Sequence, residues 1–106
     1  MQEDSWKKDS KKLLDYMSKL SKGGNKQGLA YRFLNAVKSK NKSEFEWLLD
    51  RLLIANAGEH KELVQEIVRI ISHYPLDYSE NLERIGHIIV LGLISGNANS
   101  GGEQNE

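Results

Sequence analysis

Apolar side chains recur every three to four residues along most of this chain, and this period constrains the fold more than any other feature. The clearest example lies between Lys61 and Tyr74, where one side is apolar and the opposite side polar; the apolar side comprises Leu63, Val64, Ile67, Val68, Ile70, Ile71 and Tyr74. No β-branched segment alternates with a period of two residues, as a half-buried strand would. The pattern therefore predicts an all-α protein.

Interruptions of the apolar pattern divide the chain into a compact bundle of about five helices. We expect these helices to span residues 5–21, 27–39, 43–56, 61–74 and 78–95. Ser43 with Glu46 has the spacing of a capping box at the start of the third helix, and Asp77 with Glu80 is a plausible cap for the fifth. The fifth helix is apolar nearly all round over residues 88–94, so we expect it to be central in the bundle or shared with a neighbouring subunit.

The end of the chain has a different composition. Residues 95–106 contain one Ala and no larger apolar side chain. Such a stretch cannot offset the entropy lost on ordering by burying apolar surface, so we expect a disordered polar tail over residues 96–106. Residues 1–95 then form one helical bundle domain. The longest apolar run, residues 88–94, is far shorter than the ~20 residues that cross a bilayer, which predicts a soluble, intracellular protein with no membrane partner.

Side chains suited to catalysis or metal binding form no recognisable set. The chain has no cysteine, so thiolate metal sites and disulfides are excluded. His60, His73 and His87 are not paired with acidic residues at the spacing of a zinc motif, and we interpret them as surface or boundary residues. The glycine-rich segment 23–28 lacks the Gly-Lys-Ser/Thr ending of a phosphate-binding loop. We expect no enzymatic activity, metal, cofactor or small-molecule substrate.

Charge is divided unevenly along the chain, although the net charge is zero. Residues 1–42 carry eleven basic and four acidic side chains, a net charge of +7, whereas residues 43–106 carry four basic and eleven acidic ones, a net charge of −7. Such asymmetry is typical of a basic region that faces a polyanion. The basic residues are mostly lysines, which contact phosphates as point charges, so we expect sequence-tolerant, salt-sensitive nucleic-acid binding.

The candidate nucleic-acid contacts lie on the first two predicted helices and the segments that follow them. The first helix and the loop after it contribute Lys8, Lys11, Lys12, Lys19, Lys22 and Lys26. The outer side of the second helix and the turn after it contribute Arg32, Asn35, Lys38, Lys40 and Lys42. Tyr31, also on the outer side of the second helix, either stacks on an unpaired base or simply lies over the helix surface.

A second candidate surface is apolar. Trp47 and Ile54 share a direction on the third helix that lies between Asp50 and Arg51, away from the main apolar side. An exposed Trp–Ile pair on a polar face, with Arg51 beside it, is a candidate protein interface. The alternative is that five crowded helices bury both sides of this one.

One stretch resembles a known family. It comprises Ala30-Tyr31-Arg32-Phe33-Leu34-Asn35-Ala36-Val37, followed by Lys40-Asn41-Lys42, Phe45, Leu49 and Arg51-Leu52. It is similar to the C-terminal helical part of the large subunit of type I-B CRISPR effector complexes (Cascade), a region that can also be made separately as the small subunit. The similarity covers roughly residues 29–53. Where family members continue with a Leu-Tyr pair, this chain has Leu53-Ile54-Ala55.

The resemblance implies a non-catalytic small subunit of a prokaryotic, cytoplasmic ribonucleoprotein complex for antiviral defence. Several copies would contact one another and bridge the backbone and large subunits. They would hold the guide RNA–target DNA heteroduplex or the displaced strand through backbone charge, while guide pairing supplies specificity. Within the similar stretch, the implied contacts are Arg32, Asn35, Lys38, Lys40 and Lys42. The lysines of the first helix rest on charge alone.

Three alternatives stay open at the level of sequence. One is the small subunit of a type III CRISPR complex, which is also a compact helical bundle with a basic surface. Another is a protein–protein adaptor or oligomerising module, in which Trp47, Ile54 and the fifth helix form contacts and the lysines only add solubility. The third is a dimeric helix-turn-helix DNA binder, which is disfavoured because no recognition helix with outward arginine and amide side chains follows residues 40–42.

Overall fold

The computed structural model describes residues 2–21 and 26–105, with the backbone alone for residues 2–4 and 96–105. The helices are α1 (Gln2–Leu20), α2 (Gln27–Lys38), α3 (Lys42–Asn56), α4 (Lys61–Ile71) and α5 (Ser79–Asn105). Over these described residues the chain forms five helices and no strand. The all-α fold predicted from the sequence is confirmed.

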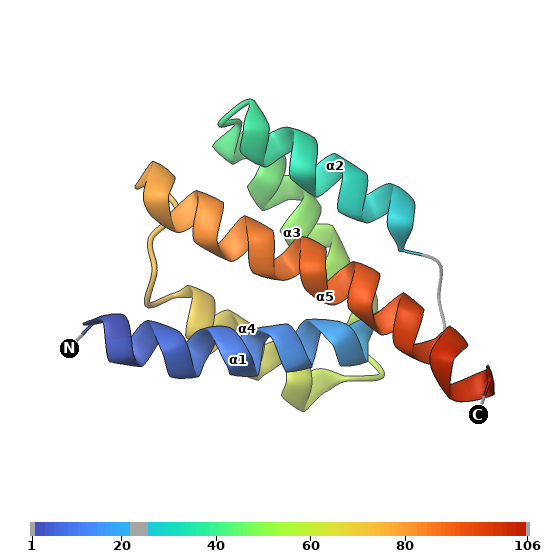
Figure 1. The fold of residues 1–106 in the computed structure, drawn as a ribbon. Coiled ribbons are helices and arrows are strands. Elements are labelled where there is room, and N and C mark those ends of the chain that lie inside the picture. The colour runs from blue at the N-terminus through green and yellow to red at the C-terminus, as the bar shows by residue number, and fades with distance from the viewer. Residues whose placement is uncertain (1, 22–25, 106) are drawn as a thin grey trace.

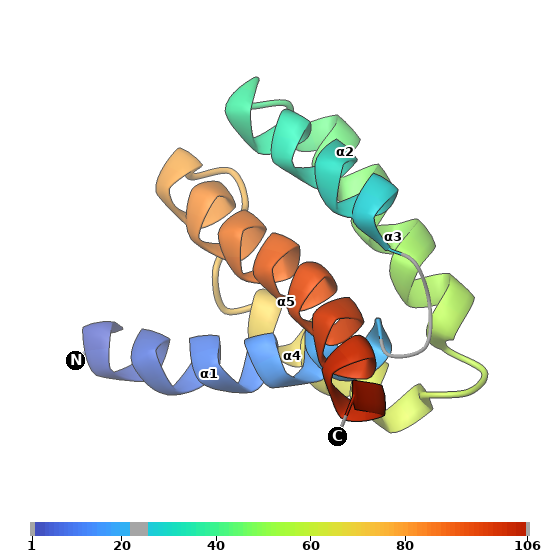
Figure 2. The same cartoon turned by 45° about the vertical axis from the view of Figure 1, so that its right-hand side comes forward.

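Helix α5 lies between two pairs of helices. α1 and α2 lie on either side of α5 in both views, with α3 against α2 and α4 against α1 (Figures 1 and 2). The core side of α5 is buried through Leu82, Ile85, Ile89 and Leu93. Of the two places expected for this helix, the structure therefore shows the centre of the bundle, although Leu91 and Ile94 stay exposed on its outer side.

Two glycines of α5 allow close approach to its neighbours. A methyl group at Gly86 would overlap Val37 of α2, and one at Gly92 would overlap Met17 of α1. Near the second contact, the buried Ser21 hydroxyl lies 3.1 Å from the carbonyl oxygen of Gly92, to which it donates. The core therefore brings α1 and α2 against α5 at two separate points.

The start of α3 differs from the prediction. Its N-cap is Asn41, whose side-chain oxygen accepts a hydrogen bond from the backbone N–H of Glu44 at 3.1 Å. The predicted Ser43–Glu46 capping box is therefore wrong. Asparagine caps a helix as well as serine does, and the carboxylate of Glu46 lies 3.7 Å from Lys42 instead of reaching back to Ser43.

The segment between α4 and α5 also differs. α4 ends at Ile71 rather than at the predicted Tyr74, because the residue before a proline is disfavoured in the helical conformation and Pro75 follows Tyr74. Tyr74 instead closes a tighter turn, donating its backbone N–H to the carbonyl of Ile71 at 2.9 Å. Asp77, the predicted cap of the fifth helix, forms an ion pair with Lys42, and α5 begins at Ser79.

The far end of α5 is longer than predicted. Its backbone follows a helical path to Asn105, beyond the predicted end at Ser95. The last buried side chain described in α5 is Leu93. Over the described part of the chain, no helix combines the length and apolar character needed to span a bilayer.

Candidate nucleic-acid interface

The lysines of α1 lie away from the core. Leu13, Met17 and Leu20 are buried against the rest of the bundle. A helical period of about 3.6 residues places Lys8 and Lys11 on the opposite side of the helix and Lys12 on its flank. Exposed side chains on α1 include Lys7, Lys8, Lys11, Lys12 and Lys19.

One of these lysines is neutralised by its own helix. The ammonium group of Lys19 lies 3.2 Å from a carboxylate oxygen of Asp15. Within the described ranges, no ion pair is found for Lys8, Lys11 or Lys12. The hydrogen bond from Arg69 lowers the pKa of Glu66 on α4, and the nearby charge of Lys12 adds to this effect. Lys8, Lys11 and Lys12 therefore form the accessible part of the predicted α1 contact surface, which we call the α1 lysine row. The predicted contact Lys22 lies outside the described residues, and Lys26 is half-buried just before α2.

The polar side of α2 forms a second row. Asn35 and Lys38 are exposed together with Tyr31, 70% of whose surface is open to solvent. The buried side of the same helix comprises Ala30, Phe33, Ala36 and Val37. Because α1 and α2 lie on either side of α5 (Figures 1 and 2), the predicted nucleic-acid contacts lie on two helices that α5 separates.

Lys42 belongs to neither surface. Its ammonium group lies 2.6 Å from Asp77 and 3.7 Å from Glu46. The pKa of Lys42 is raised, mainly by the hydrogen bond to Asp77 and then by the negative charges of both carboxylates. Its charge is therefore used to hold the start of α3 to the loop before α5.

A third surface surrounds Trp47. The guanidinium carbon of Arg32 lies 5.4 Å from the centre of the Trp47 ring, and that of Arg51 lies 5.0 Å from it. Trp47 is 48% exposed and Ile54 74% exposed, so the alternative that neighbouring helices bury both is wrong. Arg32 also lies 3.1 Å from a carboxylate oxygen of Glu44.

The Trp47 surface joins residues that the sequence assigned to different roles. Arg32 was expected to contact nucleic acid, whereas Arg51 and Trp47 were expected to contact protein. The spacing of four residues on one helix predicts that Arg51 can reach Trp47. Contact between Trp47 and Arg32 depends on how α2 packs on α3, and no local pattern reveals it.

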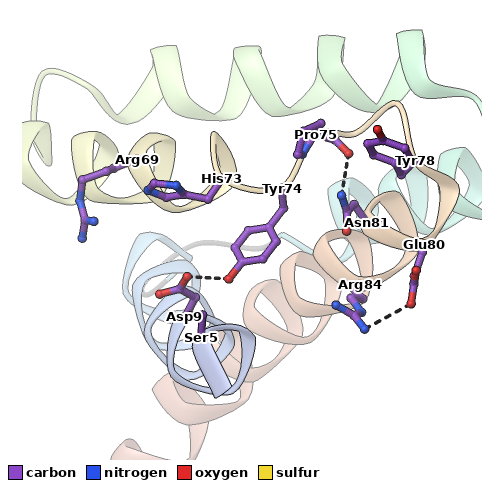
Figure 3. Close-up of a pocket in the computed structure, with 10 residues that line it drawn as sticks. All are labelled: Ser5, Asp9, Arg69, His73, Tyr74, Pro75, Tyr78, Glu80, Asn81 and Arg84. Carbon is purple, nitrogen blue, oxygen red and sulfur yellow. Dashed lines mark hydrogen bonds and ion pairs between the residues drawn. The ribbon is translucent and has the colours of Figure 1, made fainter. Parts of the chain in front are cut away.

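A hollow of about 680 Å³ lies between α1, α4 and the start of α5 (Figure 3). There the hydroxyl of Tyr74 donates to Asp9 at 2.7 Å, and Trp6 packs edge-on against Tyr74 with 5.0 Å between ring centres. Arg84 lies 5.4 Å from the centre of the Trp6 ring and 3.3 Å from Glu80. These groups are engaged in joining three helices, and we assign them a structural role.

The three histidines form no common site in the described structure. His60 occupies the N-cap position of α4 without a side-chain capping bond, and His73 and His87 are exposed. Among the residues that were searched, no group of three or more His, Asp or Glu side chains could hold a metal ion. The absence of enzymatic activity stays a prediction.

Comparison of the chain with protein-family models, with curated proteins and with solved structures finds no match. The resemblance of residues 29–53 to a CRISPR subunit therefore stays a prediction. The functional evidence in the structure is the exposed cationic and aromatic surface of α1, α2 and α3.

Proposed function

We propose that the chain is a non-catalytic small subunit of a type I (I-B-like) CRISPR effector complex, which contacts the nucleic-acid backbone through its lysines. The observation that carries the nucleic-acid role is the α1 lysine row, Lys8, Lys11 and Lys12, exposed away from the core and without ion pairs in the described ranges. The resemblance of residues 29–53 supports the assignment to a CRISPR complex.

The α1 lysine row has a cost that a polyanion would remove. Lys8 and Lys12 are four residues apart on one helix side, and like charges at this spacing destabilise a helix. Phosphates placed along the row would neutralise this repulsion and release counterions into solution. The predominance of lysine fits backbone contact without base reading, which suits a complex in which guide pairing supplies the specificity.

The nucleic-acid role is tested by the salt dependence of binding to duplex and single-stranded DNA. Replacing both Lys8 and Lys12 with Gln should lower the slope of log affinity against log salt for duplex DNA by about two. The matched control is Lys42→Gln, which removes a lysine already paired with Asp77 and Glu46 and should leave the slope unchanged. An unaltered slope in the double variant would reject the α1 lysine row as a contact surface.

Assignment to the complex is tested by co-expression with the other subunits of a type I effector and its guide RNA. The chain should co-purify with the backbone and large subunits, and target binding should weaken when it is omitted. Failure to co-purify, or full target binding without the chain, contradicts the proposal. Co-purification with type III subunits instead would support that alternative.

The exposure of Ile54 beside Trp47 favours one other candidate, a protein–protein adaptor. In that case Ile54→Asp should abolish assembly with a partner, whereas the Lys8/Lys12 variant should have no effect on any binding measured. In the small-subunit proposal the Lys8/Lys12 variant weakens DNA binding in every assay.

A further inference from the structure

Trp47 lies on the outer side of α3, and the guanidinium groups of two arginines lie near its ring. Nearly half of its surface is open to solvent, and Arg32 and Arg51 each place a guanidinium group within 5.4 Å of the ring centre. We propose that Trp47, Arg32 and Arg51 form a stacking site for an unpaired base of single-stranded nucleic acid. This inference rests on the proposed nucleic-acid role and adds to it a contact with bases.

The geometry suits a flat aromatic ligand. Guanidinium groups are planar and stack on aromatic faces, and nucleobases stack on both tryptophan rings and arginine planes. Every base has such a face, so a site of this kind tolerates any sequence. The exposed ring of Tyr31 precedes Arg32 on α2 and adds a second aromatic side chain to the same helix pair.

The charges around the ring suit the phosphates of the strand. Arg51 has no carboxylate partner within the described part of the chain, so its N–H groups are available to a phosphate. Lys38, exposed on α2, adds a further positive charge on the outer side of the helix pair. A protein partner could also use Trp and Arg. Because Arg32 is paired with Glu44 at 3.1 Å, the positive charge that favours a polyanion at this ring is mainly that of Arg51.

A shallow, open depression of about 410 Å³ beside Trp47 is where the edge of the base would lie. Its lining comprises Arg32, Asn41, Ser43, Glu44 and Trp47. The side-chain oxygen of Asn41 is used as a helix cap, which leaves its amide N–H groups and the Ser43 hydroxyl for hydrogen bonds. The carboxylate of Glu44 would repel a phosphate, so the base lies in the depression and the backbone lies on the side of Arg51.

The experiment follows the fluorescence of Trp47 during titration with DNA. The chain has two tryptophans, so Trp6→Phe leaves Trp47 as the one indole reporter. The probes are oligo(dT) of about twelve nucleotides, a typical site size, and an abasic oligonucleotide of equal length. Oligo(dT) should quench the fluorescence, and the abasic strand should not quench it, since it offers phosphates without bases.

Substitutions at position 47 then separate the effect of aromatic stacking from that of side-chain size and apolarity. Trp47→Leu keeps an apolar side chain without an aromatic face and should weaken oligo(dT) binding about 5- to 150-fold, with no effect on the abasic strand. Trp47→Phe should retain most of the affinity, which also shows that substitution at this exposed position leaves the fold intact. Ile54→Ala, seven residues further along α3, is the matched control and should bind as the parent does.

The outcomes distinguish this inference from the proposed function. Equal, salt-dependent binding of both oligonucleotides without quenching overturns the stacking site and leaves the lysine contacts standing. No binding of either oligonucleotide overturns both. An equal loss in Trp47→Leu and Ile54→Ala, without any difference between the two strands, overturns the stacking site.

Discussion

Lys40 has a backbone conformation that side chains rarely adopt, with φ at 55°. It ends α2 in a Schellman motif, in which Asn41 donates its N–H to the carbonyl of Ala36 at 2.8 Å and Lys40 donates to Val37 at 3.0 Å. Glycine usually occupies this position because a side chain there costs about 1 kcal/mol or more. The lysine at this position therefore lowers the stability of the protein and adds a positive charge to its surface, and such losses of stability are common at binding sites.

Replacing Lys40 with Gly should raise the free energy of unfolding by about 1 kcal/mol, measured by urea denaturation, because the left-handed backbone no longer opposes a side chain. The same variant should lower DNA affinity and reduce the salt slope by about one. Lys38→Gly, at the last residue of α2, is the control; its backbone is not left-handed, so this substitution should not raise the stability. A Lys40→Gly protein no more stable than the parent would contradict this account of the turn.

The exposure of a side chain was predictable from the sequence where the period of a single helix determines it. The period of α1 places Lys8 and Lys12 outside, and that of α3 places Trp47 outside, as observed. The Arg32–Glu44 and Lys42–Asp77 ion pairs were not predictable, because each joins residues from different parts of the fold. The Lys42–Glu46 pair has the local spacing of four residues on one helix. Asn41 replaces Ser43 as the cap for a local reason, since both residues are good caps and only their backbone geometry separates them.

Among the elements, α5 depends on its glycines. Alanine ordinarily favours a helix by ~1 kcal/mol over glycine, so glycines in the middle of a helix need a reason. At Gly92 the reason is the Cβ atom of Met17, which is attached directly to the backbone of α1 and cannot rotate away. The closeness of α1 to α5 therefore depends on the missing side chain at Gly92.

Gly92→Ala should destabilise the protein, because the overlap with Met17 costs about 1–3 kcal/mol and exceeds the gain in helix propensity. Gly28→Ala is the matched control, since nothing lies within 4 Å of the added methyl group, and it should stabilise by up to about 1 kcal/mol. Thermal unfolding of both variants gives the comparison. Equal stabilisation by the two substitutions would show that α1 and α5 can separate without cost.

The existence of each helix was predictable from its apolar period, but several of its ends were not. Pro75 shortens α4 through the residue before it, an effect that periodicity does not register. The central place of α5 was one of two possibilities, because a helix that is apolar nearly all round suits a core and an interface equally. Gly86 and Gly92 give no sequence signal until the helices they contact are known.

For the molecule as a whole, Tyr74 joins three helices to one another. Its hydroxyl donates to Asp9 of α1 (Figure 3). Its ring packs against Trp6 of α1, which in turn contacts Arg84 of α5. Burial, followed by the hydrogen bond and negative charge of Asp9, raises the pKa of Tyr74 from 10.0 to about 12. The folded state therefore resists ionisation of this hydroxyl.

This pKa predicts how stability varies at alkaline pH. The folded pKa is above the unfolded one, so the contribution of Tyr74 is complete below pH 10.0 and is lost as the pH rises through about 12. Tyr74→Phe should remove this alkaline loss and lower stability near neutral pH by about 1 kcal/mol. Urea denaturation across this range tests it, with ultraviolet titration of the four tyrosines to show one late group. An unchanged alkaline profile in Tyr74→Phe would contradict the assignment.

The place of α5 between α1 and α2 has a consequence for the strength of binding in the proposed role. In that role one molecule would contact a polyanion at two places, through the side chains of α1 and through those of α2. Once one of these helices is bound, the other is held near its own stretch of phosphates at a high effective concentration. The overall affinity would then exceed that of either contact alone. The complex with the polyanion should then dissociate much more slowly than a complex held by α1 or by α2 alone, provided that a single strand can reach around α5.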